Sequence, residues 1–278
     1  MSATLRTFLL FLAFLGLSTT FIFAGPVLIL DYHTFLGTHT SSLDFSDQEI
    51  TEQLTQIAKM GYSFVRLNDA IAGKSGDKLA IVITIDDGNH SVFQAWQSVF
   101  KPLGISPFLF IYPHAVDLSR FTLKSGQIHL LQKEGLDMGA HGYFHKPMGA
   151  EAWKKNPESV RVEAFQGLEP LTALLGYRPT LFAYPYGVAP PPVQDLVKSA
   201  GYTWAFAAND KIIPVDFSDP SLNHYYVPRT IVYRWNVKRI LKYLKAGIQQ
   251  DKKAAEPQTV DQNPPVNVSL SASPSMNP

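Results

Sequence analysis

A chain of 278 residues has room for one domain of about 200 to 250 residues with a full core. Hydrophobic residues make up 46% and charged residues 17%, which is typical of a globular protein and excludes a disordered one. The formal net charge of +1 argues against a nucleic-acid partner, and the absence of cysteine means that any metal must be held by nitrogen and oxygen ligands.

Residues 1–24 have the pattern of an export signal. Arg6 precedes the apolar run Phe8–Leu17, and Ala24 offers a small residue for cleavage. The alternative is an uncleaved N-terminal anchor, because the apolar stretch could nearly span a membrane. We favour the signal peptide. Either way the sequence predicts a secreted or periplasmic protein of the bacterial cell envelope, with membrane contact only through this segment if it is retained.

Between residues 25 and 250, apolar runs alternate with helical patterns. The expected strands are Val27–Leu30, Leu79–Ile85, Pro107–Ile111, Thr180–Ala183, Thr203–Ala207 and Val227–Val232, with weaker candidates at Tyr62–Val65 and Leu136–Gly139. Near-continuous apolar runs fit parallel strands that are covered on both faces. About seven βα units in one domain predict an α/β barrel closed on itself.

Two helical patterns are marked by their ends. Residues 46–49 form a capping box that leads into an apolar stripe ending at Gly61. A second apolar stripe runs from Val162 to Leu175 and ends at Gly176. The four tryptophans are interpreted as core residues. Residues 251–278, rich in Pro, Ser, Asn and Ala, predict a disordered tail.

Unusual polar residues follow the predicted strands. They are Asp31 and His33, Asp86 and Asp87, His114, His141 and His145, Tyr184 to Gly187, and Arg229 in the last strand. In a parallel barrel the carboxyl ends of all strands share one face, where active sites are built. The sequence therefore predicts that these distant residues meet at one mouth.

Asp86 and Asp87 end a hydrophobic strand as a pair of adjacent carboxylates. One can bind a cation while the other stays free as a base, although Asp-Gly is also a common turn pair. His141 and His145 are four residues apart and can bind one ion, whereas the alternative is a pair of surface histidines. One Asp with two His suits Zn²⁺ or a similar divalent ion, which would serve the hydrolysis of an amide or ester.

These residues resemble the motifs of the polysaccharide deacetylase family, the NodB-homology carbohydrate esterases. Its T-F-D-D-G motif is similar to residues 84–88, its H-(S/T)-x-x-H motif to 141–145, and its R-x-P-Y-G motif to 183–187. The match covers about Val27 to Val232. The resemblance implies a single-domain, distorted (β/α)₇ barrel. It implies Asp86 as catalytic base, Asp87, His141 and His145 as metal ligands, and the Tyr186 N–H as an oxyanion donor.

The chain departs from the family pattern at two places. Ala183 replaces the arginine that orients the catalytic aspartate, and the C-terminal Leu-x-His motif, the usual source of the general acid, is not recognisable. Residues 29–33 and the pair Pro228–Arg229 resemble the exported branch that acts on poly-β-1,6-N-acetylglucosamine in biofilm formation. We expect Arg229 to replace the missing arginine and His33 to lie in the site, either as proton donor or as a buried histidine bonded to Asp31.

The predicted function is metal-dependent removal of N-acetyl groups from an amino-sugar polysaccharide, such as poly-N-acetylglucosamine, peptidoglycan or a chitin-like polymer. The expected metal is Zn²⁺, with Co²⁺ or Ni²⁺ as alternatives. One alternative function is an O-acetyl polysaccharide esterase, because the same ion would cleave an ester. The other is a glycan-binding protein with a degenerate site, which the altered third motif would favour. The sequence does not specify an oligomeric state.

Overall fold

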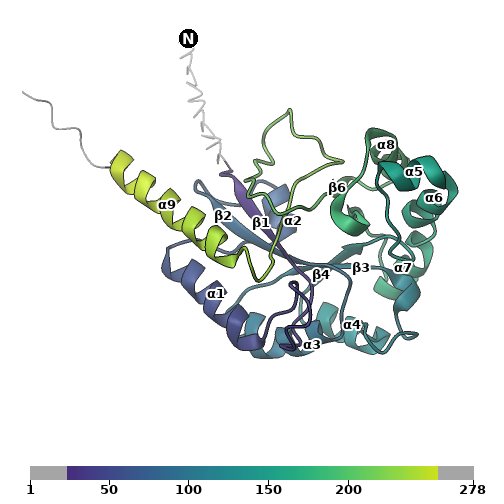
Figure 1. The fold of residues 1–278 in the computed structure, drawn as a ribbon, viewed down its shortest axis with the longest axis horizontal. Coiled ribbons are helices and arrows are strands. Elements are labelled where there is room, and N and C mark those ends of the chain that lie inside the picture. The colour runs from purple at the N-terminus through teal and green to yellow at the C-terminus, as the bar shows by residue number, and fades with distance from the viewer. Residues whose placement is uncertain (1–23, 256–278) are drawn as a thin grey trace, which may run out of the picture.

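The computed structural model describes residues 24–255, which form one α/β domain (Figure 1). The sheet contains β1 (Val27–Tyr32), β2 (Ala80–Ile85), β3 (Phe108–Ile111), β4 (Asp137–Ala140), β5 (Leu181–Ala183), β6 (Trp204–Phe206) and β7 (Thr230–Ile231). Their order is β6-β5-β4-β3-β2-β1-β7, and every pair is parallel. The strand predictions are confirmed except at residues 62–65, where only Phe64 makes an isolated bridge, to Ile81.

Backbone hydrogen bonds join the two ends of this sheet. The segment after β6 pairs with the segment that leads into β7, through Ala207 N–H to Val227 O at 2.9 Å and Arg229 N–H to Ala207 O at 3.1 Å. On its other side β7 pairs with β1. The strands therefore curl into a distorted (β/α)₇ barrel, as the sequence predicted.

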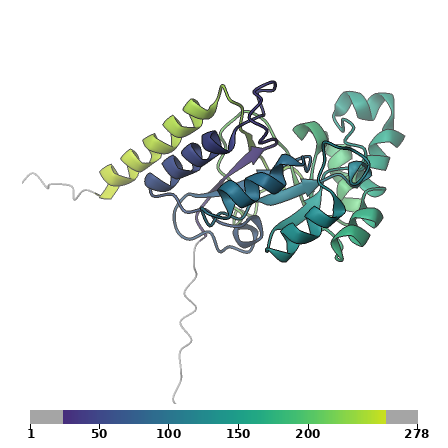
Figure 2. The same cartoon turned by 90° about the horizontal axis from the view of Figure 1, so that it is seen from below.

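Helices cover the outside of the barrel (Figures 1 and 2). They are α1 (Asp47–Lys59), α2 (Leu67–Ile71), α3 (Ser91–Ala95) continued by a π-turn (Trp96–Phe100), α4 (Ser125–Lys133), α5 (Ala150–Lys155), α6 (Pro157–Phe165), α7 (Leu168–Leu175), α8 (Pro191–Ser199) and α9 (Val237–Ala255). Short 3₁₀ turns lie at Pro113–Ala115 and Pro185–Gly187. Helix α9 packs beside α1.

The predicted capping box at the start of α1 is confirmed. Ser46 Oγ accepts from the Glu49 N–H at 3.2 Å, and Glu49 Oε2 accepts from the Ser46 N–H at 2.8 Å. The second stripe, in contrast, is two helices and not one. A side chain at Gly167, between α6 and α7, would lie 2.6 Å from the Gly142 carbonyl oxygen. The break thus lets the loop after β4 pack against the helices.

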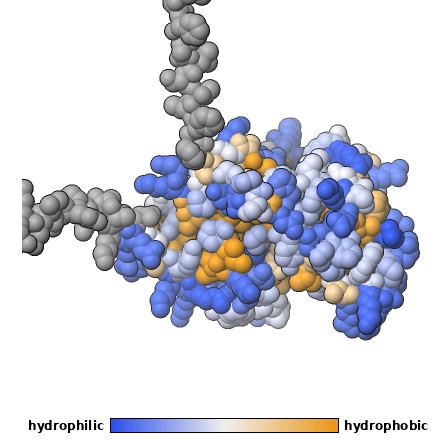
Figure 3. Space-filling view, turned by 90° about the horizontal axis from the view of Figure 1, so that it is seen from above, coloured by the Kyte–Doolittle hydropathy of each residue, from blue (hydrophilic) through white to orange (hydrophobic). Residues whose placement is uncertain are grey.

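The core has two layers, because strand side chains alternate between the two faces of the sheet. One cluster fills the barrel and includes Ile29, Val82 and Phe110. The other lies between the strands and the helices and includes Leu30, Ile83 and Leu109. On the surface view of Figure 3, apolar residues gather in small patches among polar ones.

Two sequence predictions concern the ends of the chain. The predicted signal peptide or anchor, residues 1–24, lies outside the described residues except for Ala24. Helix α9 extends to Ala255, into the first residues of the predicted tail, and the remainder of the tail is outside the described range. Within residues 24–255 no helix combines the length and apolar character needed to cross a membrane.

Candidate active site

The interior of the barrel changes from apolar to polar near the carboxyl ends of the strands. Inward positions alternate along each strand, and the lower ones, such as Ile29 and Val82, are apolar. The next inward positions carry polar side chains, all of them buried. This inner polar layer consists of Asp31, Thr84, Asp86 and Arg229.

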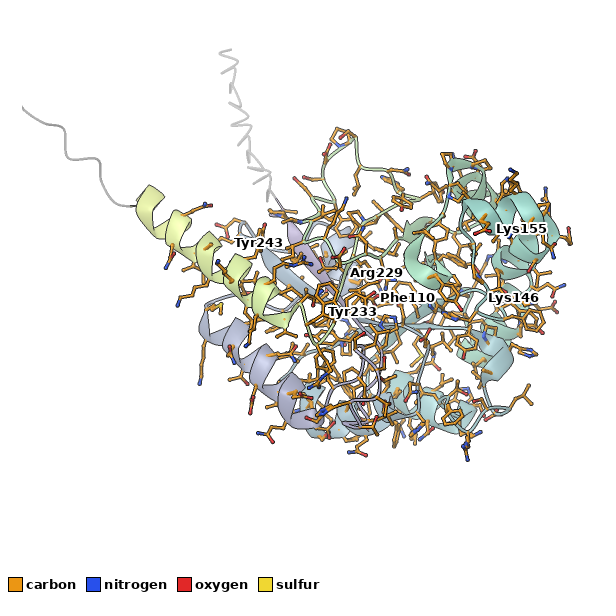
Figure 4. All side chains as sticks on the ribbon, viewed as in Figure 1. Phe110, Lys146, Lys155, Arg229, Tyr233 and Tyr243 are labelled. Carbon is orange, nitrogen blue, oxygen red and sulfur yellow. The ribbon has the colours of Figure 1, made fainter. Side chains whose placement is uncertain are left out.

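Arg229 connects the members of the inner polar layer. Its Nη1 and Nη2 donate to the two carboxylate oxygens of Asp86, each at 2.7 Å, which fixes the plane of that carboxylate. Nη1 also lies 3.1 Å from Oδ1 of Asp31 and 3.1 Å from Oγ1 of Thr84. The guanidinium lies 5.1 Å from the centre of the Phe110 ring (Figure 4). The structure thus places a guanidinium on Asp86 although residue 183 is not arginine.

Two buried carboxylates share this guanidinium. Burial by itself would raise the pKa of Asp86, but the charges of Arg229 and His141, together with the hydrogen bonds from Arg229, outweigh burial and hold that pKa below its ordinary value. Burial raises the pKa of Asp31 to about 7, and the neighbouring charge of Asp86 adds to the increase. Below neutral pH the pair therefore carries one proton, on Asp31, and Asp86 stays ionised.

The three predicted metal ligands meet beside the inner polar layer. Asp87 Oδ1 lies 3.0 Å from Nε2 of His145 and 3.3 Å from Nε2 of His141. One ligand atom from each residue falls within 4.8 Å of the others. We call Asp87, His141 and His145 the ligand cluster. Asp86 is close to it, with Oδ2 at 3.7 Å from His141 Nε2.

His141 is oriented by a contact on the far side of its ring. Its Nδ1 lies 2.9 Å from the Ala183 carbonyl oxygen, which can only accept, so Nδ1 carries the proton. In the neutral ring Nε2 is then a bare acceptor that faces carboxylate oxygens. Two acceptors at this distance require a cation between them, either a proton or a metal. The residues therefore fit a divalent ion with one carboxylate and two imidazole ligands.

The charges in the ligand cluster reflect the same contacts. Burial would lower the pKa of His141, but the carboxylates of Asp86 and Asp87 outweigh it and raise that pKa. Burial would raise the pKa of Asp87, but the close imidazoles of His141 and His145 outweigh burial and hold that pKa well below its ordinary value. The carboxylate of Asp87 is therefore ionised and available as a ligand.

The backbone is strained around the ligand cluster. Asp87 has φ of 70°, His145 of 63° and Tyr186 of 62°, all in the left-handed region that favours glycine. They are three of the five non-glycine residues with positive φ in the described chain, and the other two lie elsewhere. Each such residue costs roughly 1–3 kcal/mol and tends to occur where function fixes the geometry.

Glu163 holds the loop that carries His145, a role that the sequence did not predict. Its buried carboxylate accepts from the backbone N–H groups of Tyr143 at 2.7 Å, Phe144 at 3.0 Å and His145 at 3.1 Å. A side chain on Gly142 would lie 2.4 Å from Glu163 Oε2, so glycine is required there. In the sequence Glu163 is one polar residue of an ordinary amphipathic helix, and no local signal marks it.

A cavity of about 240 Å³ opens over the inner polar layer and the ligand cluster. It is lined by Asp31, His33, Leu43, Asp86, Asp87, His141, His145, Tyr186, Gly187, Ala208, Ile231 and Tyr233. His33 is half-buried, and its Nδ1 has no hydrogen-bond partner among the described residues. The alternative of a histidine bonded to Asp31 is thus not what the structure shows. Tyr186 is largely exposed, and its ring centre lies 5.0 Å from that of His145.

Three other histidines lie outside this cavity. His114 packs against the Phe144 ring at 4.4 Å. His224 stacks on Trp204 at 3.8 Å. His90 starts helix α3. These positions leave His33 as the histidine that lines the cavity without belonging to the ligand cluster.

The sequence comparison identifies the class of protein. Residues 73–205 match the sequence model of the polysaccharide deacetylases. This segment is a polysaccharide deacetylase domain, which makes the protein a hydrolase, a polysaccharide deacetylase. No curated protein sequence matches the chain significantly.

Solved structures share the fold. IcaB from Ammonifex degensii is 23% identical with a TM-score of 0.66, over 80% of this chain and 97% of that one. The deacetylase PplD of Streptococcus pyogenes, solved with acetate, is 15% identical with a TM-score of 0.66, over 79% and 98%. A de-N-acetylase from Aggregatibacter actinomycetemcomitans is 16% identical with a TM-score of 0.63, over 78% and 99%. At these identities the similarity establishes the fold alone.

Proposed function

We propose that this protein is a metal-dependent de-N-acetylase that acts on poly-N-acetylglucosamine outside the cytoplasm. The observation that carries the proposal is the placement of a guanidinium-held carboxylate, Asp86, within 3.7 Å of a ligand cluster suited to a divalent ion. The polymer is inferred from the sequence resemblance at residues 29–33 and 228–229. The de-N-acetylase activity of a structural neighbour with the same fold is consistent with it.

Asp87, His141 and His145 would hold the metal, most suitably Zn²⁺, with Co²⁺ or Ni²⁺ as alternatives. When bound, such an ion lowers the pKa of a water ligand towards about 7 and polarises a carbonyl group. The protein contributes a fixed donor set, because Glu163 and the Ala183 carbonyl orient the loop and the imidazole that present it.

Asp86 acts as the general base. The pKa of its carboxyl group lies below the ordinary value because the charges of Arg229 and His141 and the hydrogen bonds from Arg229 together outweigh burial, so Asp86 is ionised and free to accept a proton from the attacking water. The bidentate contact with Arg229 also keeps the carboxylate from rotating. Arg229 is therefore a positioning residue for the base, in the place of the arginine that the third motif lacks.

Tyr186 and His33 both line the cavity and complete the chemistry. The left-handed turn at Tyr186 brings its backbone to the cavity wall, where its N–H stabilises the negative oxygen of the tetrahedral intermediate. Loss of one such donor typically costs about 10²–10³ in rate. His33, which lines the same cavity, returns a proton to the leaving amine.

Export through residues 1–24 belongs to the same proposal, because the polymer lies outside the cytoplasm. Cell fractionation with an antibody against the folded domain tests it, and the mass of the isolated chain shows whether the segment is removed. Recovery of the full-length protein in the cytoplasm contradicts the proposed location.

The function is tested with purified protein and N-acetylglucosamine oligomers, with and without a chelator, by measuring product mass and released acetate. We expect a loss of one acetyl group per event, abolished by the chelator and restored by Zn²⁺. Release from O-acetylated polymer alone identifies an esterase instead. Oligomer binding without any acetate release identifies a glycan-binding protein and overturns the proposal.

A further inference from the structure

The cavity over the reacting groups is too small for a polymer. Its volume of about 240 Å³ is below the roughly 300 Å³ at which small-molecule pockets usually begin. It can take one sugar unit with its acetamido group. The neighbouring units of a polysaccharide must therefore lie on the rim, and residues that bind them determine whether a polymer is held.

A stacked aromatic pair stands at this rim, in the loop between β7 and α9. The rings of Tyr233 and Trp235 are 5.1 Å apart and inclined by only 11°. Tyr233 lines the cavity together with Asp86 and Asp87. Trp235 was expected to be a core residue, but it is 60% exposed. An aromatic ring exposed beside the cavity is placed to contact a ligand that extends out of it.

The loop that carries the pair is rigid. The side chain of Asn236 is fully buried, its Oδ1 accepts from the Tyr233 N–H at 2.9 Å, and its Nδ2 donates to the Ile231 carbonyl at 2.9 Å. Between the two aromatic residues, Arg234 donates to Glu49 Oε1 at 2.7 Å. The pair is thus held in place before any ligand arrives, which lowers the entropic cost of binding.

The positively charged side chain of Arg239 lies against the ring of Trp235, the more exposed residue of the pair. The Arg239 guanidinium lies 5.6 Å from the centre of the Trp235 ring and is hydrogen-bonded to the Asp210 carbonyl. Arg239 and Tyr233 thus both lie next to the Trp235 ring. Flat aromatic faces with fixed orientation bind the apolar C–H face of a pyranose ring, and they offer large contact area with little loss of side-chain entropy.

We propose that Tyr233 and Trp235 form a binding subsite for the pyranose ring next to the sugar unit that is deacetylated. The inference rests on the proposed function, because it assigns the substrate of the same site. The ligand it specifies is an uncharged pyranose unit of a chain, held by ring contact and not by a charge pair. The subsite makes the enzyme favour oligomers over single sugars.

Steady-state kinetics on N-acetylglucosamine oligomers of increasing length test the subsite. For Trp235→Ala we expect KM on the longer oligomers to rise about two- to tenfold, the effect of losing one stacked aromatic contact, with a smaller change in kcat. Trp235→Phe, which keeps a ring, restores most of the affinity. The matched control is Tyr243→Ala, an exposed aromatic residue further along α9 (Figure 4), which leaves both constants unchanged.

A binding measurement separates this inference from the proposed function. All four tryptophans lie within the described residues, and Trp235 alone is exposed, so oligomer binding to the Asp86→Asn variant should change the tryptophan fluorescence. The change should be absent when Trp235→Phe is added. If the wild type releases acetate but Trp235→Ala has an unchanged KM and the fluorescence does not respond, the subsite is wrong and the function stands. If the wild type releases no acetate, the proposed function itself fails.

Discussion

The inner polar layer and the ligand cluster are neighbours that compensate carboxylate charge in different ways. In the inner polar layer a buried guanidinium contacts Asp86 through two hydrogen bonds of 2.7 Å. In the ligand cluster the carboxylate of Asp87 lies beside two imidazoles. Asp86 and Asp87 are adjacent in sequence, yet the left-handed turn at Asp87 directs them into these two surroundings. The structure thus places the proposed base and a proposed metal ligand in different surroundings within one dipeptide.

Asp87→Asn tests the ligand side of the comparison and should have the largest effect. An amide oxygen replaces the one negatively charged ligand, so metal affinity falls and kcat decreases by roughly a thousandfold or more, because the several kcal/mol supplied by the ion are lost. Metal content by elemental analysis and acetate release measure both effects. Normal metal content with normal activity contradicts the assignment of Asp87.

Asp86→Asn tests the inner polar layer, where Asp86 is the proposed general base. Loss of the general base should lower kcat by about 10²–10⁴-fold while metal stoichiometry stays at the wild-type value. The same two assays are read side by side for the two variants. If Asp86→Asn loses the metal as completely as Asp87→Asn does, the division between base and ligand is wrong.

Glu163→Gln tests whether the loop after β4 is held by its carboxylate. An amide can accept from fewer of the three N–H groups and brings a donor towards them, so the His145 turn should loosen. We expect metal affinity to fall by about 10- to 100-fold, as for other residues that orient ligands. Circular dichroism at high metal concentration should remain that of the wild type. An unchanged affinity would show that the turn is fixed without Glu163.

Asp31→Asn should have the smallest effect, and we expect it in the pH dependence of stability and not in the rate. Its pKa is raised from its ordinary value to about 7, so the folded state keeps a proton that the unfolded chain releases near pH 4. The free energy of unfolding should therefore decrease as the pH rises from about 4 to about 7. Asp31→Asn should flatten this slope, measured by urea unfolding across that range. An equal slope in both proteins contradicts a protonated Asp31.

Much of the barrel and of the site was predictable from the sequence. Strands such as β2 are buried on both faces and appear as continuous apolar runs, and polar residues at their ends identify the mouth. The structure brings together Asp86, Asp87, His141 and His145 as the motifs indicated. The role of Arg229 could be predicted only because residue 183 is not the arginine that the family motif has.

Other features depend on contacts between distant segments and leave no local pattern. Glu163 lies 18 residues after His145 on a separate helix, and only the packing of α6 against the loop reveals its role. The break at Gly167 follows from the same contact. Trp235 was predicted to be a core residue. The sequence around a single aromatic residue near the end of a barrel strand does not show whether its side chain is buried or exposed. These are tertiary effects that override local propensity.

The central claim is that Asp87, His141 and His145 bind a divalent ion while Asp86 remains unbound. Anomalous diffraction at the zinc absorption edge, from crystals grown with Zn²⁺, tests it most directly. We predict one strong peak at about 2.0–2.2 Å from an Asp87 oxygen and from Nε2 of both histidines, with Asp86 still paired to Arg229. A peak bound by Asp86 in place of Asp87, or zinc bound only elsewhere, would contradict the account.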